Sequence, residues 1–360
     1  MKILFVVNTL SNGGAEKVVA TLSNKMAENG HEVHVIQVYN SIKYEIDNQV
    51  KIHYLLDKQD RISFLKKGIS TIKLSKLLKT KVNEIEKNGK FDLITSHLIL
   101  ADVISFLAKI DTYSCIHNNY SEHPFFRKKF NQLFLKLIYK NKKVLGISHG
   151  VLKDWKESIG IKTKDSIVVY NPIDVNKVRK LSNDKSVNII NENYIVHVGR
   201  FSKQKRHDIL IRAFSKIEGN YKLVLIGEGE TQQDIQKLVN ELNLNEKVIF
   251  KGWCKNPYPW IKNAKLLVLT SDTEGLPIVA LESISLGTPI VCTRFCGVDE
   301  IMQYSLSKYV CEPRNVDDIA AKITQCLRNG KFDMTDNLID DILDNFKIEN
   351  VVNNYLSLIK

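Results

Sequence analysis

The sequence predicts an α/β protein of two domains, each built around a parallel β-sheet. Short apolar runs alternate with helical segments over most of the chain, and a length of 360 residues suggests about two domains. Between the halves, residues 181–193 form a polar stretch of the kind that links domains. The clearest single unit is residues 266–292, where strand, loop, helix and strand signals follow in order.

In that unit, residues 266–269 are apolar and predict a buried strand, and residues 290–292 predict the next one. Pro277 suits the first turn of the helix between them, where a missing N–H costs nothing. Glu274 then lies in the loop before this helix, and Glu282 is expected about two turns inside it.

The start of this helix is a candidate phosphate site, because a helix N-terminus has free N–H groups and a partial positive charge. The residues expected around the phosphate are Gly275, Leu276, Pro277 and Ile278. Glu274 and Glu282 would flank the phosphate and accept hydrogen bonds from the hydroxyls of ribose or a hexose. The alternative is that one is a capping-region carboxylate and the other an ordinary surface glutamate.

The first domain begins with a strand at residues 2–8, followed by a turn that contains Gly13 and Gly14. Two glycines between a strand and a helix let a ligand approach the backbone, or serve only the geometry of a tight turn. They do not form GxGxxG, so the dinucleotide-binding fingerprint is absent. This disfavours a dehydrogenase.

Two histidines come just after predicted strands. Residues 91–95 precede His97, and residues 113–116 precede His117. This is the rim where parallel α/β sheets bind ligands. A histidine that is neutral at pH 7 can hydrogen-bond a sugar hydroxyl, although a loop histidine without a special role is the alternative.

The second domain opens with a strand at residues 194–198, followed by Arg200 and Lys205. Basic residues between a strand and a helix are natural phosphate ligands, because Arg offers a planar fork and Lys a point charge. A solvated basic loop is the alternative. Residues 227–229, Gly-Glu-Gly, could suggest dinucleotide binding, but no third glycine follows in register.

Together these motifs resemble the retaining glycosyltransferases of family 4. Glu274 and Glu282 match its E-x7-E signature within "TSDTEGLPIVALESISLGTPIV", "GRFSKQK" matches its GR-x4-K pair, and "CIHNN" is similar to its histidine position. The resemblance implies the GT-B fold, with two Rossmann-like domains facing across a cleft. It implies an acceptor-side domain at 1–182, a nucleotide-sugar domain at 190–335, and a C-terminal helix at 336–360 that packs toward the first domain.

The resemblance also implies roles for individual residues. Those expected to contact the donor are Gly13, Gly14, His117, Arg200, Lys205, Glu274 and Glu282. Arg200 and Lys205 would stabilise the leaving diphosphate, and no metal cofactor is expected, because such a site supplies its own positive charge. Glu274 would contact sugar hydroxyls and Glu282 the ribose, while His97 is similar to a polar position near the acceptor.

The positive charge of the chain is concentrated in its first half. Residues 1–170 hold 27 Lys and Arg against 16 Asp and Glu, whereas the whole chain holds 52 against 40. Residues 61–81 and 127–143 are basic and contain no acid. Both suggest contact with an anionic membrane surface, and an ordinary solvated surface is the alternative.

Within the first basic block, an apolar stripe at helical spacing predicts an amphipathic helix. Its members are Ile62, Leu65, Ile69 and Ile72. No run of 18 apolar residues predicts a membrane span, and the six scattered cysteines suggest a reducing compartment. We therefore expect a cytoplasmic protein on the inner face of the cell membrane. No nucleic-acid-binding motif is present.

The expected activity is transfer of a hexose or N-acetylhexosamine from a nucleoside-diphosphate sugar, with uridine as the favoured base. A lipid-linked saccharide is the expected acceptor, as in surface polysaccharide assembly. Three alternatives remain: a soluble acceptor, a GT-B enzyme such as a sugar-nucleotide epimerase, and a non-catalytic membrane-binding protein.

Overall fold

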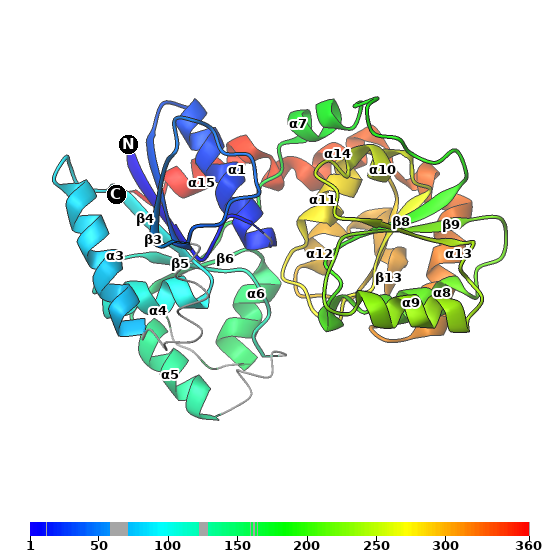
Figure 1. The fold of residues 1–360 in the computed structure, drawn as a ribbon, viewed down its shortest axis with the longest axis horizontal. Helices are drawn as coiled ribbons and strands as arrows, with labels where there is room; N and C mark the ends of the chain where they lie inside the picture. Colours follow the sequence, from blue (N-terminus) through cyan, green and yellow to red (C-terminus); the bar gives the residue numbers. More distant parts are fainter. Residues whose placement is uncertain are drawn as a thin grey trace. The chain divides into compact units, whose positions relative to one another are not determined.

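The computed structural model describes residues 1–11, 13–57, 71–121, 129–158, 160, 163 and 165–359. The chain forms two compact units (Figure 1). Unit 1 comprises residues 1–172 and 348–360, and unit 2 comprises residues 173–347. Each unit is an α/β structure around its own parallel sheet, and the two sheets have seven and six strands. The predicted fold class, GT-B, is confirmed.

Unit 1 holds the seven-stranded sheet, in the order β3-β2-β1-β4-β5-β6-β7, with all pairs parallel. Its strands are β1 Lys2–Val7, β2 Glu32–Tyr39, β3 Lys51–Leu56, β4 Leu93–His97, β5 Tyr113–Ile116, β6 Lys143–Gly146 and β7 Asp165–Val168. Its helices are α1 Gly14–Glu28, α3 Thr71–Glu86, α4 Ile99–Leu107, α5 Lys129–Tyr139, α6 His149–Lys153, η1 Asp154–Ser158 and α15 Ile348–Leu356.

The inner strand β1 is buried because helices cover both faces of the sheet. All six residues of β1 are buried. On one face, Leu4 and Val6 pack against the buried stripe of α3, which includes Leu74 and Leu78. The other face carries α1 and α15, which lie side by side (Figure 1).

Unit 2 holds the six-stranded sheet, in the order β10-β9-β8-β11-β12-β13, again fully parallel. Its strands are β8 Tyr194–Val198, β9 Lys222–Ile226, β10 Val248–Gly252, β11 Leu266–Leu269, β12 Ile290–Thr293 and β13 Val310–Cys311. Its helices are α7 Val175–Leu181, η2 Lys203–Lys205, α8 His207–Phe214, α9 Gln232–Glu241, α10 Tyr258–Asn263, α11 Ile278–Ser285, α12 Val298–Ile301, η3 Tyr304–Tyr309, α13 Val316–Asp333, α14 Asp336–Leu343 and η4 Asp344–Phe346.

Strand order determines where loops can form a site. In unit 1 the order reverses between β1 and β4, and in unit 2 between β8 and β11. At such a reversal the two following loops diverge to opposite faces and leave space at the carboxyl ends of the strands. The loops that carry the predicted site residues follow these four strands and β5.

The boundary between the two units lies between residues 172 and 173, before the polar stretch at 181–193 that was predicted as the linker. Residues 173–181 belong to unit 2, because α7 packs against α10 and α11. Arg179 Nε donates to the carbonyl oxygen of Ser285 at 3.0 Å, and this contact anchors the helix. The C-terminal segment is three pieces rather than one helix, since α14 and η4 belong to unit 2 and α15 to unit 1.

Candidate functional site

Two loops of unit 2 are joined side by side at the reversal point of its sheet. They follow β8 and β11, which are neighbouring strands. The Asp272 amide donates to the Gln204 carbonyl at 2.8 Å, and Gln204 Nε2 donates to the Thr273 carbonyl at 2.5 Å. The Thr270 hydroxyl lies 3.1 Å from the Lys205 carbonyl oxygen. These bonds fix one loop against the other, so charges on both have defined positions.

Lys205 and Glu274 form an ion pair across the two loops. Lys205 Nζ lies 2.5 Å from Glu274 Oε1, and the side chains are only 19% and 11% exposed. The sequence predicts that Lys205 binds a phosphate and Glu274 a hydroxyl, and in the structure the two side chains are in direct contact. An ammonium has three donors, so two N–H groups of Lys205 remain for a ligand.

The α11 N-terminus lies in the same loop as Glu274. The N-cap is Pro277, which has no N–H, and the first helical bond runs from the Ala280 amide to the Pro277 carbonyl at 3.1 Å. The amides of Gly275, Ile278 and Val279 donate to no protein group among the described residues. These amides and the Lys205 ammonium form a positively polarised surface suited to an anion.

Arg200 lies in the first loop and is exposed, without an ion-pair partner in the described part of the chain. The neighbouring backbone is held by the Gly-Glu-Gly turn after β9. The Phe201 amide donates to the Glu228 carbonyl at 3.0 Å, and a Cβ on Gly227 would lie 2.0 Å from the Gly199 carbonyl oxygen. Because these glycines lack a side chain, the backbone of the Gly-Glu-Gly turn can contact the backbone of the loop that carries Arg200.

Glu282 is buried, with 3% of its surface exposed. It is the fifth residue of α11, so it lies about one turn inside the helix rather than the expected two. Its Oε1 accepts a hydrogen bond from the Tyr258 hydroxyl at 3.2 Å. Tyr258 is not predicted from the sequence, because no motif marks a residue of α10 that packs beside α11.

Asp272 lies in the same loop as Glu274. Both of its carboxylate oxygens accept hydrogen bonds from Arg314 at 2.9 Å, and Arg206 approaches it at 3.3 Å. Its negative charge is therefore compensated within unit 2. Across the described ranges, no three His, Cys, Asp or Glu side chains gather as a metal site.

In unit 1, Gly13 is the N-cap of α1 and Gly14 its first residue. The Gly13 carbonyl accepts a hydrogen bond from the Tyr44 hydroxyl at 3.1 Å. A Cβ on Gly13 would lie 2.2 Å from Glu16 Oε2, so glycine allows this carboxylate to approach the helix start. Because Glu16 is an acid in the first turn, it weakens the attraction of this helix end for an anion.

His97 ends β4, and His117 follows β5 directly. Their rings meet, with His97 Nδ1 2.9 Å from His117 Nε2. His97 is fully buried and His117 is 6% exposed. Burial lowers the pKa of His117 to about 4 and that of His97 well below its usual value, so both rings are neutral at neutral pH.

Two family models together match most of the chain. The model described as "Glycosyltransferase Family 4" matches residues 12–177, and that of "Glycosyl transferases group 1" matches residues 179–341. The chain belongs to the family 4 glycosyltransferases. The predicted family and enzyme class are thus confirmed, and the two matched segments correspond closely to units 1 and 2.

Relatives of this glycosyltransferase are similar over most of their length. A Campylobacter jejuni protein is 29% identical over 81% of the chain and 80% of its own length. It is named N-acetylgalactosamine-N,N'-diacetylbacillosaminyl-diphospho-undecaprenol 4-alpha-N-acetylgalactosaminyltransferase. The lipopolysaccharide 1,6-galactosyltransferase of Salmonella typhimurium is 27% identical over 96% of the chain and 95% of its own length.

Among solved structures, the glycosyltransferase resembles Anabaena HepE in complex with UDP and glucose. The TM-score is 0.77 at 18% identity, and the match covers 99% of each chain. At this identity the likeness concerns the fold. It agrees with the two parallel sheets of the GT-B architecture.

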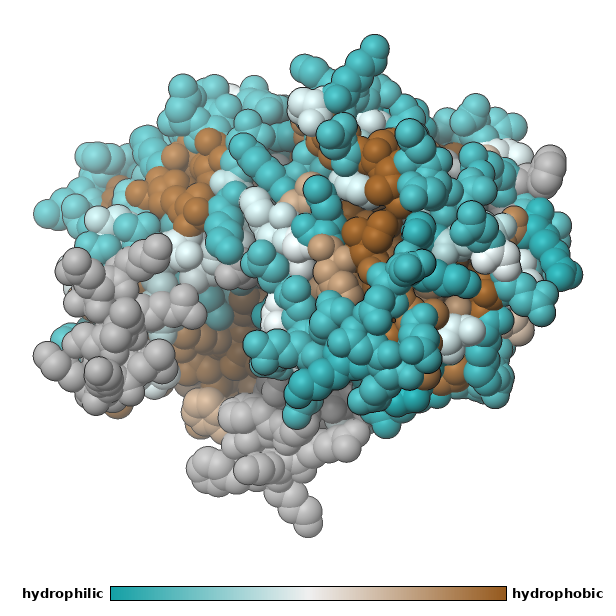
Figure 2. All heavy atoms as spheres, turned by 45° about the vertical axis from the view of Figure 1, so that its right-hand side comes forward, coloured by the Kyte–Doolittle hydropathy of each residue, from teal (hydrophilic) through white to brown (hydrophobic). Residues whose placement is uncertain are grey.

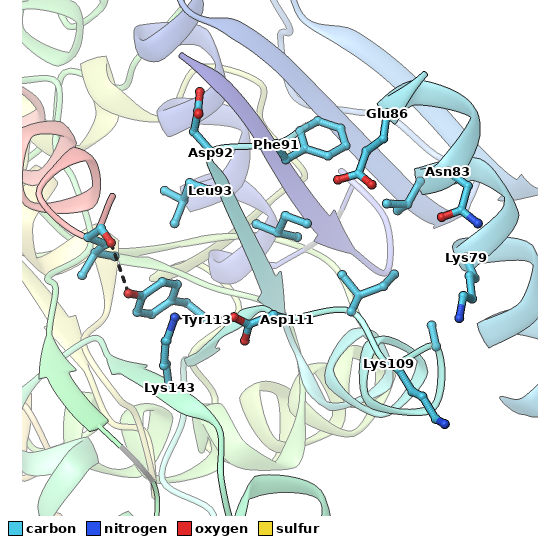
Figure 3. Close-up of a pocket in the computed structure, with 15 residues that line it drawn as sticks. Lys79, Asn83, Glu86, Phe91, Asp92, Leu93, Lys109, Asp111, Tyr113 and Lys143 are labelled. Atoms are coloured by element: carbon cyan, nitrogen blue, oxygen red, sulfur yellow. Dashed lines mark hydrogen bonds and ion pairs between the residues drawn. The ribbon is translucent and has the colours of Figure 1, made fainter. Parts of the chain in front are cut away.

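The glycosyltransferase also has a cavity of about 500 Å³ far from the predicted site residues of unit 1. It lies at the amino ends of the strands, where Leu93, Tyr113 and Lys143 begin β4, β5 and β6 (Figure 3). The loops with Gly13 and His117 follow the carboxyl ends of β1 and β5, at the opposite edge of the sheet.

Proposed function

We propose that this glycosyltransferase moves a hexose or N-acetylhexosamine from a UDP-sugar to a lipid-linked saccharide, with retention of anomeric configuration. The observation that carries the proposal is the Lys205–Glu274 pair at 2.5 Å beside the free amides of α11. The names of the Campylobacter jejuni and Salmonella typhimurium relatives support the sugar and acceptor classes.

The central chemical task is to stabilise the diphosphate as it leaves the sugar. Negative charge on its oxygens is met by two N–H groups of Lys205 and by the amides of Gly275, Ile278 and Val279. Arg200 adds a planar fork on an exposed, adjustable side chain. These donors are positioned before the reaction, so little reorganisation is needed when the charge develops. The proposed site needs no metal cofactor.

The two glutamates have separate proposed roles. Glu274 accepts a hydrogen bond from a sugar hydroxyl through the oxygen that Lys205 does not hold. Glu282 accepts from the ribose, and the Tyr258 hydroxyl orients its carboxylate. A donor phosphate oxygen takes the proton of the acceptor hydroxyl as the new bond forms on the same face. In unit 1, Gly13 and Gly14 bind the donor through backbone amides, and His117 binds the sugar.

A lipid-linked acceptor fits the surface of unit 1. On α5, Leu133 and Leu137 are 68% and 63% exposed, and Phe134 is 41% exposed. On the face drawn in Figure 2, residues of high hydropathy form patches among hydrophilic residues. Lys136 and Lys140 lie among or next to these α5 residues. We include contact with an anionic membrane, from the cytoplasmic side, in the proposed function.

The two basic blocks are described only in part. Residues 61–70, including Ile62, Leu65 and Ile69, and residues 127–128 lie outside the described range. Ile72 is exposed, whereas α3 buries a different stripe that includes Leu74 and Val82. Ile72 is therefore separate from the face that packs on the core. No described helix is both long and apolar enough to cross a membrane.

A thermal-shift panel of UDP-, GDP- and ADP-sugars tests the donor. A UDP-sugar at 100 times its dissociation constant should add about 2.7 kcal/mol of stability, while the other nucleotides add less. Equal shifts for all three would refute the preference for uridine.

Product analysis then tests the reaction. A transferase releases UDP in step with a glycosylated lipid acceptor, whereas an epimerase forms no glycosylated product. Release of UDP with transfer only to a water-soluble saccharide would favour the soluble-acceptor alternative.

A further inference from the structure

A chain of buried polar groups leads through unit 1 to His117. Thr95 and His97 are fully buried on β4. Thr95 Oγ1 lies 3.1 Å from His97 Nε2, and His97 Nδ1 lies 2.9 Å from His117 Nε2. The ring of Phe5 lies 5.8 Å from that of His97, which adds an apolar neighbour. Both nitrogens of His97 are thus engaged, and it has no exposed surface for a substrate.

The direction of the two hydrogen bonds follows from counting protons. Each neutral imidazole carries one N–H, and the threonine hydroxyl carries one O–H. If Thr95 donates to His97 Nε2, then His97 Nδ1–H donates to His117 Nε2. In the reverse order, His117 Nε2–H donates to His97 and His97 Nε2–H donates to Thr95.

Thr95 decides between these arrangements. Its hydroxyl has no hydrogen-bond partner other than His97 in the described part of the chain. In the reverse order, the buried hydroxyl hydrogen would therefore have no acceptor. A buried donor without a partner costs about 1–3 kcal/mol. The first arrangement satisfies every hydrogen in the chain of groups.

The first arrangement leaves His117 with its proton on Nδ1. That nitrogen has no partner among the described residues, and His117 retains 6% exposure. We propose that Thr95 and His97 are positioning residues that hold His117 as an Nδ1–H donor toward a sugar oxygen. This rests on the proposed function, which assigns His117 to the sugar, and adds the groups that set its tautomer.

Nitrogen-15 NMR of the full-length protein labelled at histidine tests the tautomer without a substrate. The ring nitrogens of His117, assigned by comparison with His117→Asn, should show a protonated Nδ1 and a bare Nε2. Thr95→Ser should keep this pattern. Thr95→Val, which has nearly the same shape, removes the hydroxyl donor and should give a mixture of tautomers. A His117 protonated on Nε2 in the wild type would overturn the proposal.

Kinetics with the UDP-sugar found by the binding panel test the role in transfer. Loss of one hydrogen bond predicts about a fivefold lower kcat/KM in Thr95→Val, with Thr95→Ser close to wild type. His97→Gln can still donate to His117 and should retain more activity than His97→Leu. Equal kcat/KM in Thr95→Val and wild type would show that Thr95 and His97 have only a structural role, and would overturn the proposal that they position His117.

The two failures can be distinguished. Absence of sugar transfer by the wild type would refute the proposed function and the sugar contact with it. The NMR pattern of the same sample would still decide whether Thr95 and His97 set the tautomer.

Discussion

At the residue scale, the chemistry proposed for unit 2 depends on a few side chains with shared partners. Lys205 is held by Glu274 and lies beside amides that have no protein acceptor. A carboxylate so close to a phosphate site also cancels part of the positive charge. We infer that the pair orients the ammonium, while the amides and Arg200 supply charge that Glu274 does not neutralise.

Glu274→Gln should lower kcat without abolishing turnover. Glutamine keeps an acceptor oxygen but loses the charge-assisted bond, which predicts a decrease of about 10- to 100-fold. Steady-state kinetics measures the effect, with Glu230→Gln, an exposed carboxylate on the turn after β9, as control. A trapped glycosyl adduct on Glu274 would show that it is a nucleophile.

Gly227→Ala should destabilise the protein much more than Gly30→Ala. Both glycines have positive φ, +141° and +82°, so both substitutions strain the backbone. A Cβ at Gly227 also meets the Gly199 carbonyl oxygen at 2.0 Å, whereas nothing lies within 4 Å at Gly30. Urea unfolding should show a loss of about 1 kcal/mol at Gly30 and more than about 3 kcal/mol at Gly227. Similar losses would mean that the Gly-Glu-Gly turn does not support the Arg200 loop.

At the scale of elements, α4 and α5 are joined by a buried carboxyl group. Asp102 accepts hydrogen bonds from the Ser96 hydroxyl and the Tyr139 hydroxyl, each at 2.5 Å. Burial raises its pKa from 3.8 to about 6, against the opposing effect of Lys142. The group therefore links β4, α4 and α5, the helix whose apolar side chains are exposed.

The stability of unit 1 should decrease as Asp102 ionises. Its folded pKa lies above the unfolded value, so this stabilisation is present below about pH 4 and is lost as the pH rises through about 6. The wild type should lose about 3 kcal/mol over that range relative to Asp102→Asn. Urea unfolding across pH measures the difference, with the exposed Asp111→Asn as control. Parallel pH curves for wild type and Asp102→Asn would contradict this.

The exposed face of α5 should contribute to membrane binding. Leu137→Glu removes apolar contact and adds a negative charge, so binding to anionic vesicles should fall at least about tenfold. Ile167→Glu on β7 is the control, because Ile167 is also an exposed apolar residue of unit 1, at 42%. Vesicle flotation compares the two, and equal binding by both variants would exclude α5 from the contact.

At the scale of the whole molecule, charge is distributed unevenly between the two halves of the sequence. The excess of Lys and Arg lies in residues 1–170, and residues 171–360 are nearly balanced. The half with the positive charge includes α5 with its exposed leucines. In the half with the Lys205–Glu274 site, Arg206 and Arg314 both form ion pairs with Asp272.

Wild-type binding to anionic vesicles should fall steeply as salt is raised. The Debye length decreases from about 30 Å at 0.01 M to about 8 Å at 0.15 M, so attraction to the lipid surface is screened. Flotation with anionic and neutral vesicles measures this. Equal binding to both kinds, or binding to neither, would refute electrostatic docking.

The sequence alone predicted the α/β architecture and most residues of the proposed unit 2 site. Apolar runs such as residues 266–269 and the following Gly and Pro residues specify strand, loop and helix locally, because their period and backbone preferences require no distant partner. The spacing of Arg200, Lys205, Glu274 and Glu282 was recognised through the resemblance to the family 4 motifs. The sequence pattern did not predict β3, because this strand lies at an edge of the sheet and only Leu56 in it is buried.

Only the tertiary structure decided which groups meet. It paired Lys205 with Glu274, placed Tyr258 on Glu282, and joined Thr95, His97 and His117 into one chain of hydrogen bonds. Apart from the Thr95–His97 contact within β4, these contacts join residues that are at least 20 positions apart in the sequence. Strand order and burial set such distances and exclude water, and neither is encoded in the local pattern around any one residue.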